Sequence, residues 1–89
     1  MRRTVKRVLD GDTFETLRKI NGSNRVRLAN VNAPERGSSG GRKATNVLRG
    51  MIGGKTVTVN PVGRSYGRTV AKVSSDRRSV NRRMNRKGY

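Results

Sequence analysis

The sequence contains no cysteine and no histidine in its 89 residues. A zinc finger, a thiol nucleophile, a Ser-His-Asp triad and a histidine-ligated metal site are therefore excluded. Any catalysis must rest on carboxylates, arginines, hydroxyl groups and a hard cation. The lack of cysteine suits both reducing and oxidising compartments, so it assigns the protein to neither.

Acidic residues are scarce: five Asp and Glu stand against 22 Lys and Arg, a formal net charge of +17. The basic residues run through the whole chain and do not form a tail. Because self-repulsion at this charge destabilises a compact domain, we expect a polyanionic partner, with nucleic acid first and an anionic membrane second. No long apolar run is present, so we expect no membrane association.

Aromatic residues are also few, with one Phe and two Tyr. Small barrels that hold single strands without sequence preference stack the bases on aromatic side chains. Storage of single strands is therefore not the main role that this composition favours.

Turn signals and alternating apolar residues predict five strands and two helices, which we place in one domain spanning residues 1–89. The strands cover residues 4–9, 13–17, 25–31, 55–60 and 68–73. The helices cover residues 44–52 and about 80–87. Turns are predicted at residues 10–12, 21–23 and 74–76, loops at 37–41 and 63–67, and Pro61 closes the fourth strand.

Helix signals support both helices. The apolar residues of the first helix recur on one face, at Ala44, Val47, Leu48, Met51 and Ile52. Gly53 and Gly54 end this helix. Ser79 is the predicted N-cap of the second helix and Gly88 its C-cap.

Three strands, a helix, two strands and a helix in a small basic chain favour an α+β, mainly β fold. We predict a five-stranded barrel of the oligonucleotide-binding (OB-fold) type with two short helices, whose first three strands form an antiparallel meander. Closure of the barrel removes exposed strand edges.

The segment from Val26 to Glu35 combines a strand with charged residues at its end. Arg27 lies on the strand face opposite Val26 and Leu28, and Glu35 follows the proline that stops the strand. Taken alone, this segment is more simply a half-buried strand with a solvated arginine and an acidic turn residue.

Asp12 and Glu35 come to the same rim of the sheet if the second and third strands pair. A hard cation such as Ca²⁺ takes carboxylate, amide and carbonyl oxygens, which Asp12, Asn32 and the Ala33 carbonyl offer. Arg27 would then face a phosphate held by that ion.

Arg68 would face the same phosphate, and Glu35 would act as general base toward water. Each residue also has an ordinary interpretation: a turn at Asp12, one solvated cation among many at Arg68, and a core or rim side chain at Tyr66.

Four motifs occur in one order along nearly the whole chain. They are residues 5–14 (VKRVLDGDTF), Arg27 through Glu35, Tyr66-Gly67-Arg68, and Val80-Asn81. In this order they closely resemble the staphylococcal (micrococcal, thermonuclease) nuclease family. The resemblance implies an OB-fold-type barrel with helices and Ca²⁺-dependent hydrolysis of DNA or RNA without strong sequence choice.

By position, the resemblance implies a metal-ligand aspartate at Asp12 and a ligand carbonyl at Ala33. It implies that Arg27 and Arg68 hold the phosphate and its transition-state charge, and that Glu35 is the base.

Tyr66 matches a tyrosine beside the substrate, while three positions depart from the family pattern. Asn32 replaces the usual aspartate, so this ligand keeps its oxygen but loses its charge, and we expect weaker metal binding. Ser65 stands where a basic residue is common. The sequence stops at Gly88-Tyr89, within the family's last motif, whereas family members continue with a segment of nucleotide-contacting tyrosines.

We therefore predict a monomeric Ca²⁺-dependent endonuclease acting on DNA or RNA, preferably single-stranded or denatured. The alternatives are a catalytically weakened or inactive nucleic-acid-binding barrel and a basic architectural or ribosomal-type protein. The resemblance favours a secreted or periplasmic location, although charges interrupt the N-terminal segment and leave no signal-peptide core.

Overall fold

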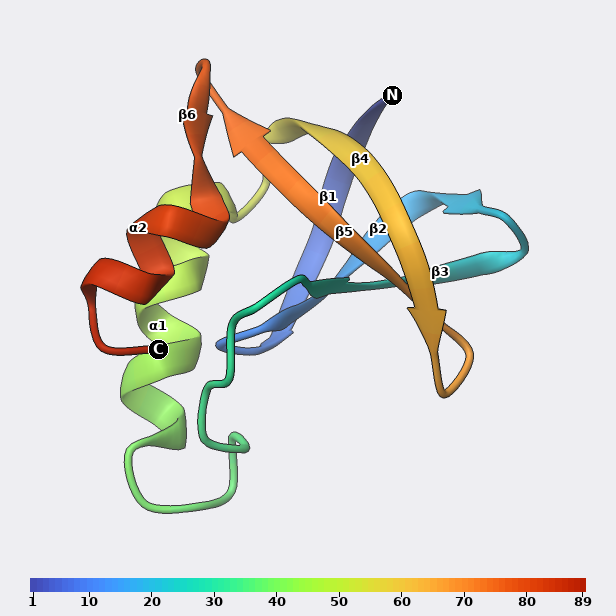
Figure 1. Cartoon of the computed structure of the whole chain (residues 1–89). Helices are drawn as coiled ribbons and strands as arrows, with labels where there is room; N and C mark the ends of the chain where they lie inside the picture. Colours follow the sequence, from blue (N-terminus) through green and yellow to red (C-terminus); the bar gives the residue numbers. More distant parts are fainter.

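Six strands and two helices make up the computed structural model, which describes all 89 residues (Figure 1). The elements are β1 (Arg2–Asp10), β2 (Thr13–Ile20), β3 (Ser23–Leu28), α1 (Gly41–Ile52), β4 (Thr56–Ser65), β5 (Arg68–Ser75), β6 (Arg78–Ser79) and α2 (Val80–Arg86). The predicted fold class is confirmed, and the two-residue β6 is an addition to it.

A parallel pairing closes the barrel. Strands run in the order β3-β2-β1-β4-β5-β6, and every neighbouring pair in this order is antiparallel. β3 then pairs with β5 in parallel, with Val26 opposite Thr69. The β1-β2-β3 meander is as predicted, whereas the sequence did not indicate which strands would close the barrel.

Two tight turns use residues with positive φ. Asn21 (φ 50°) and Gly22 (φ 84°) join β2 to β3, and Tyr66 (φ 50°) and Gly67 (φ 76°) join β4 to β5. Two consecutive positive φ values match the twist of antiparallel strands, and Asn and Gly adopt them with little strain. The turn predicted at residues 21–23 is therefore present.

Several predicted boundaries were wrong. β2 runs to Ile20 and not to residue 17, and α1 begins at Gly41 and not at residue 44. β4 runs to Ser65, so the loop expected at residues 63–67 is only the turn at Tyr66 and Gly67.

Three further boundaries also differ from the prediction. The third strand ends at Leu28 and not at residue 31, because the chain turns at Asn30 with φ 59°. Pro61 does not close β4, since this half of the strand has one partner and a register shift follows the proline. The turn expected at residues 74–76 lies at Asp76 and Arg77, so β5 extends through Ser75.

The helices cover one end of the barrel (Figure 1). Buried residues of α1 include the predicted stripe apart from Val47, which is partly buried against the core. Ser79 caps α2 by accepting a hydrogen bond from the Arg82 amide at 3.2 Å, as predicted, and Gly88 follows the actual C-cap, Lys87. Neither helix is long and apolar enough to cross a membrane.

Asn81 ties α2 to the barrel. Its Oδ1 accepts a hydrogen bond from the Val73 amide at 2.8 Å, and its Nδ2 donates to the carbonyls of Ala29 and Ala71 at 2.9 and 3.1 Å. All three bonds are buried, so they are protected from competition with water. They fix the point at which the chain leaves β3.

Glu15, an acid outside the predicted site, forms an ion pair with a residue on the neighbouring strand. Arg7 stands opposite it in the β1–β2 register, with Arg7 Nε 2.9 Å from Glu15 Oε1. The hydrogen bond from Arg7 lowers the pKa of Glu15 below the ordinary value of 4.5, although desolvation acts in the opposite direction. This acid therefore belongs to the scaffold.

Candidate active site

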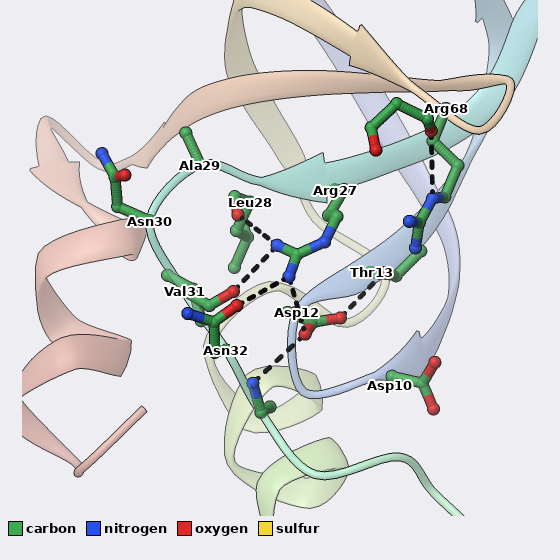
Figure 2. A network of polar contacts seen from close by, with 12 residues as sticks. Asp10, Asp12, Thr13, Arg27, Leu28, Ala29, Asn30, Val31, Asn32 and Arg68 are labelled. Atoms are coloured by element: carbon green, nitrogen blue, oxygen red, sulfur yellow. Dashed lines mark hydrogen bonds and ion pairs between the residues drawn. The ribbon is translucent and has the colours of Figure 1, made fainter.

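Three of the five acids in the chain line one cleft of about 270 Å³ together with two arginines. Figure 2 shows Asp10, Asp12, Arg27 and Arg68 among them. The residues that line it are Asp10, Asp12, Arg27, Asn32, Ala33, Glu35 and Arg68. No apolar side chain larger than alanine contributes, so the cleft suits a charged ligand.

Strand pairing brings these residues together. The β1–β2 turn carries Asp12, and the next residue, Thr13, stands opposite Arg27 in the β2–β3 register. The parallel pairing places Arg27 opposite Val70, close to Arg68 at the start of β5. The expectation that the second and third strands would pair is confirmed.

Asp12 is 8% exposed and both of its carboxylate oxygens are engaged. Oδ1 accepts a hydrogen bond from the Thr13 hydroxyl at 2.9 Å, and Oδ2 accepts one from the Ala33 amide at 3.2 Å. Oδ2 also lies 3.6 Å from Nη2 of Arg27. The carboxylate is thus held in one orientation, and it joins the β1–β2 turn to the loop after β3.

Arg27 clamps that loop (Figure 2). Its Nη1 donates to the carbonyls of Leu28 and Val31 at 2.9 and 2.8 Å, and its Nη2 donates to Asn32 Oδ1 at 3.0 Å. With the Asp12 ion pair, four of the five guanidinium N–H groups face the protein. The loop geometry therefore depends on Arg27.

Arg68 makes fewer hydrogen bonds to the protein than Arg27 does. Its Nε donates to the Ser65 carbonyl at 3.4 Å, a long bond, and its two terminal nitrogens have no protein partner. The side chain is half-buried at the edge of the cleft. Its terminal N–H groups are therefore available to a ligand, and a guanidinium matches phosphate oxygens in a two-pronged geometry.

Glu35 has a fixed main chain and an exposed side chain. Its carbonyl accepts hydrogen bonds from the Ser38 amide at 2.9 Å and the Ser38 hydroxyl at 2.7 Å. Gly41 lies against the same carbonyl so closely that a Cβ there would clash with it. The backbone is thus positioned by the start of α1, while the carboxylate keeps access to solvent.

The oxygen atoms that line the cleft are of the type that a hard cation takes as ligands. Asp12 and Asn32 present side-chain oxygens, and Ala33 lines the same cleft. Only one of these residues carries a formal charge, and no group of three acidic, histidine or cysteine side chains is close enough to hold a metal ion. Asp10 lines the cleft but accepts a hydrogen bond from the Arg36 amide at 2.9 Å.

The structure brings together every site residue expected from the sequence except Tyr66. That side chain is 95% exposed, in the β4–β5 turn, and does not line the cleft. Sequence reasoning treated Asp10 only as a turn residue and did not assign Asn81 a role. The sequence held a signal for each residue. Asp10 is one of only five acids in a basic chain, and Asn81 is a polar residue beside the apolar edge of α2, so a role could have been expected for both.

The family profile described as "Staphylococcal nuclease homologue" matches residues 25–89, from within β3 to the last residue. The chain belongs to this family. The matched segment contains Arg27, Asn32, Glu35 and Arg68, and Asp12 precedes it.

Comparison with individual proteins agrees with the family profile. An Escherichia coli protein named "Uncharacterized endonuclease" is 42% identical over 86 residues, covering 94% of this chain and 56% of its own length. A Haemophilus influenzae protein of the same name is 35% identical over 85 residues, covering 94% of this chain and 48% of its own. The chain thus spans about half the length of these relatives.

Proposed function

We propose that the protein is a Ca²⁺-dependent endonuclease that hydrolyses phosphodiester bonds of DNA or RNA with little sequence specificity. The observation that carries this proposal is the cleft, where three of the five acids of a +17 chain gather beside two arginines. The family assignment and the endonuclease names of the relatives support it.

Glu35 is the residue that would activate water. Its exposed carboxylate takes a proton from a water molecule, whose oxygen then forms a bond to phosphorus in line with the ester oxygen that leaves. The leaving oxygen takes up a proton from solvent. The fixed backbone at Glu35 limits how far the carboxylate can drift from the reacting phosphate.

Arg68 would stabilise the charge that builds on the phosphate, because its two terminal nitrogens lack protein partners. Arg27 has one N–H group left over from its loop contacts. It would act on the phosphate chiefly through its charge and through the loop that it holds.

Asp12, Asn32 and the Ala33 carbonyl would hold the Ca²⁺ ion. When bound, the ion would polarise a phosphodiester oxygen and raise the electrophilicity of phosphorus.

Low sequence specificity follows from the chemistry of the lining. Guanidinium groups contact the phosphates of the sugar-phosphate backbone, which all sequences share. Tyr66 stands two residues before Arg68 and would stack on a base beside the scissile phosphate. Unpaired strands expose the faces of their bases more readily than duplexes do, so we expect a preference for single-stranded or denatured substrate. We propose that the protein acts as a monomer.

A nucleic-acid-binding barrel with weakened or lost catalysis is the second candidate. It is favoured by one observation: a single formal negative charge among the three expected metal ligands. Both candidates bind nucleic acid in a salt-dependent way, so activity must separate them.

Digestion of denatured DNA in millimolar Ca²⁺ tests the proposal. We expect degradation that a chelator abolishes and that Glu35→Gln and Arg68→Ala each reduce by roughly 100-fold or more. Arg78→Ala, an exposed arginine outside the cleft, is the matched control and should cleave like the unaltered protein. Full activity in Glu35→Gln would rule out Glu35 as base, and no activity in the unaltered protein would favour the second candidate.

A further inference from the structure

A second hollow lies on the exposed face of α1 and the loop before it, and we call it the arginine groove. Its volume is about 580 Å³, compared with about 270 Å³ for the cleft. It is lined by Arg36, Gly37, Arg42, Thr45, Asn46 and Arg49. The lining contains no acid and no hydrophobic residue.

The three arginine charges of the groove have no acidic partner. Every ion pair in the structure involves a different arginine, and α1 contains no Asp or Glu. Arg42 and Arg49 are seven positions apart and so share a helix face, with Asn46 between them accepting a hydrogen bond from Arg49 Nη1 at 2.8 Å. Unpaired like charges around one hollow repel one another, and a bound anion would relieve that repulsion.

The groove adjoins the cleft. Glu35 lines the cleft and the next residue, Arg36, lines the groove. The Arg36 amide also donates to Asp10, another cleft residue, at 2.9 Å. A polyanion that leaves the cleft past Glu35 therefore meets the arginine groove next.

We propose that the arginine groove binds backbone phosphates of a single-stranded polynucleotide on one side of the scissile phosphodiester. This rests on the proposed function for the identity of the strand as substrate, although the binding itself requires no hydrolysis. Guanidinium groups pair with phosphate oxygens in a two-pronged geometry, and all sequences share these phosphates, so such contacts add affinity and strand length without sequence choice.

Binding of labelled thymidylate strands to Arg42→Ala/Arg49→Ala tests the proposal. Fluorescence anisotropy is measured with strands of about thirty and about three nucleotides, with chelator present so that no turnover occurs. For the long strand we expect Kd to rise roughly tenfold near 0.1 M salt and the slope of log K against log[salt] to fall by about 1.4, the value for two lost phosphate contacts on a single strand. The short strand should lose much less affinity, because it cannot reach from the cleft into the groove.

Arg18→Ala/Arg78→Ala is the matched control, since both arginines are exposed, line neither the cleft nor the arginine groove and change the net charge equally. An equal rise in Kd in the two double variants would overturn the proposal and leave only general charge attraction. Absence of hydrolysis by the unaltered protein in Ca²⁺ would instead overturn the proposed function, and this binding measurement would be unaffected.

Chemical modification of the unaltered protein gives a second readout that does not depend on variants. Phenylglyoxal labels accessible arginines, and mass spectrometry locates the labels. We expect the long strand to protect Arg42 and Arg49 more strongly than Arg18 and Arg78. Equal labelling of all four with and without the strand would contradict a phosphate contact in the groove.

Discussion

Asn32 supplies an amide oxygen that faces a guanidinium. Its Oδ1 accepts a hydrogen bond from Arg27 Nη2 at 3.0 Å, and Asp12 Oδ2 lies 3.6 Å from the same nitrogen. A carboxylate at position 32 would meet the same arginine and would also place a second negative charge beside Asp12. The residue thus limits the charge that the cleft can offer to a cation.

Asn32→Asp is expected to tighten Ca²⁺ binding on the order of tenfold, because a charged ligand replaces a neutral one of the same shape. Calorimetric titration of Ca²⁺ into both proteins measures the change. Asn30→Asp is the control, since Asn30 is exposed and does not line the cleft. Equal affinities for the Asn32→Asp and unaltered proteins would show that position 32 does not face the ion.

At the scale of elements, three segments meet at Gly11 with almost no space between them. A Cβ at Gly11 would lie 2.6 Å from Cβ of Ala44 on α1 and 2.7 Å from Cβ of Ala33 in the loop after β3. Small residues at all three positions allow the β1–β2 turn, the loop and the helix to approach. Of the cleft residues, Ala33 belongs to this junction and Asp12 directly follows Gly11, so the packing of the junction sets their separation.

Gly11→Ala is expected to destabilise the fold by about 1 to 3 kcal/mol, because the extra methyl overpacks a closed junction. Thermal unfolding measures the loss. Gly50→Ala is the control: a Cβ there meets nothing within 4 Å, and alanine should stabilise α1 by about 0.5 to 1 kcal/mol. Unfolding of Gly11→Ala at the temperature of the unaltered protein would mean that the turn and helix can move apart at little cost.

Local signals predicted most elements, because local physics produces them. The α1 stripe, the Ser79 cap and the Asn21-Gly22 turn depend on neighbours within a few positions, and all three are present. The parallel β3–β5 pairing depends on contacts between distant residues and leaves no local pattern. Pro61 was wrongly predicted to end β4. A strand tolerates proline where it has a partner on one side only, and the number of partners along β4 is not visible in the sequence.

The cleft residues could be named from the sequence because strand ends and turns placed them at one rim. The hydrogen-bond partners of these residues could not be predicted. Arg27 donates hydrogen bonds to two main-chain carbonyls and to the Asn32 side chain because of the path that residues 28–32 take, and the sequence does not specify that path. The functions of these side chains stay predictions until activity is measured.

The whole molecule is dominated by its charge. A formal charge of +17 is held within principal extents of 32 × 28 × 21 Å. The Debye length is about 30 Å at 0.01 M salt and about 10 Å at 0.1 M. At the lower salt, repulsion therefore acts across the entire fold.

We expect Tm to rise by about 4 to 8 °C between 0.01 M and 0.1 M salt, because screening removes roughly 1 kcal/mol of self-repulsion. Calorimetry in sodium chloride and in sodium fluoride should give the same rise if general screening is responsible. A Tm that falls with added salt would show that the three ion pairs outweigh the repulsion.

The parallel pairing of β3 with β5 also decides when the cleft comes into existence as the chain folds. The β1-β2-β3 meander joins strands that are adjacent in sequence, whereas Val26 and Thr69 are more than forty positions apart. Such distant pairings form late, because the entropy of closing a long loop must be offset first. Arg27 and Arg68 stand on the two sides of this pairing. A partly folded chain can therefore attract nucleic acid through its charge before it possesses the cleft that would act on it.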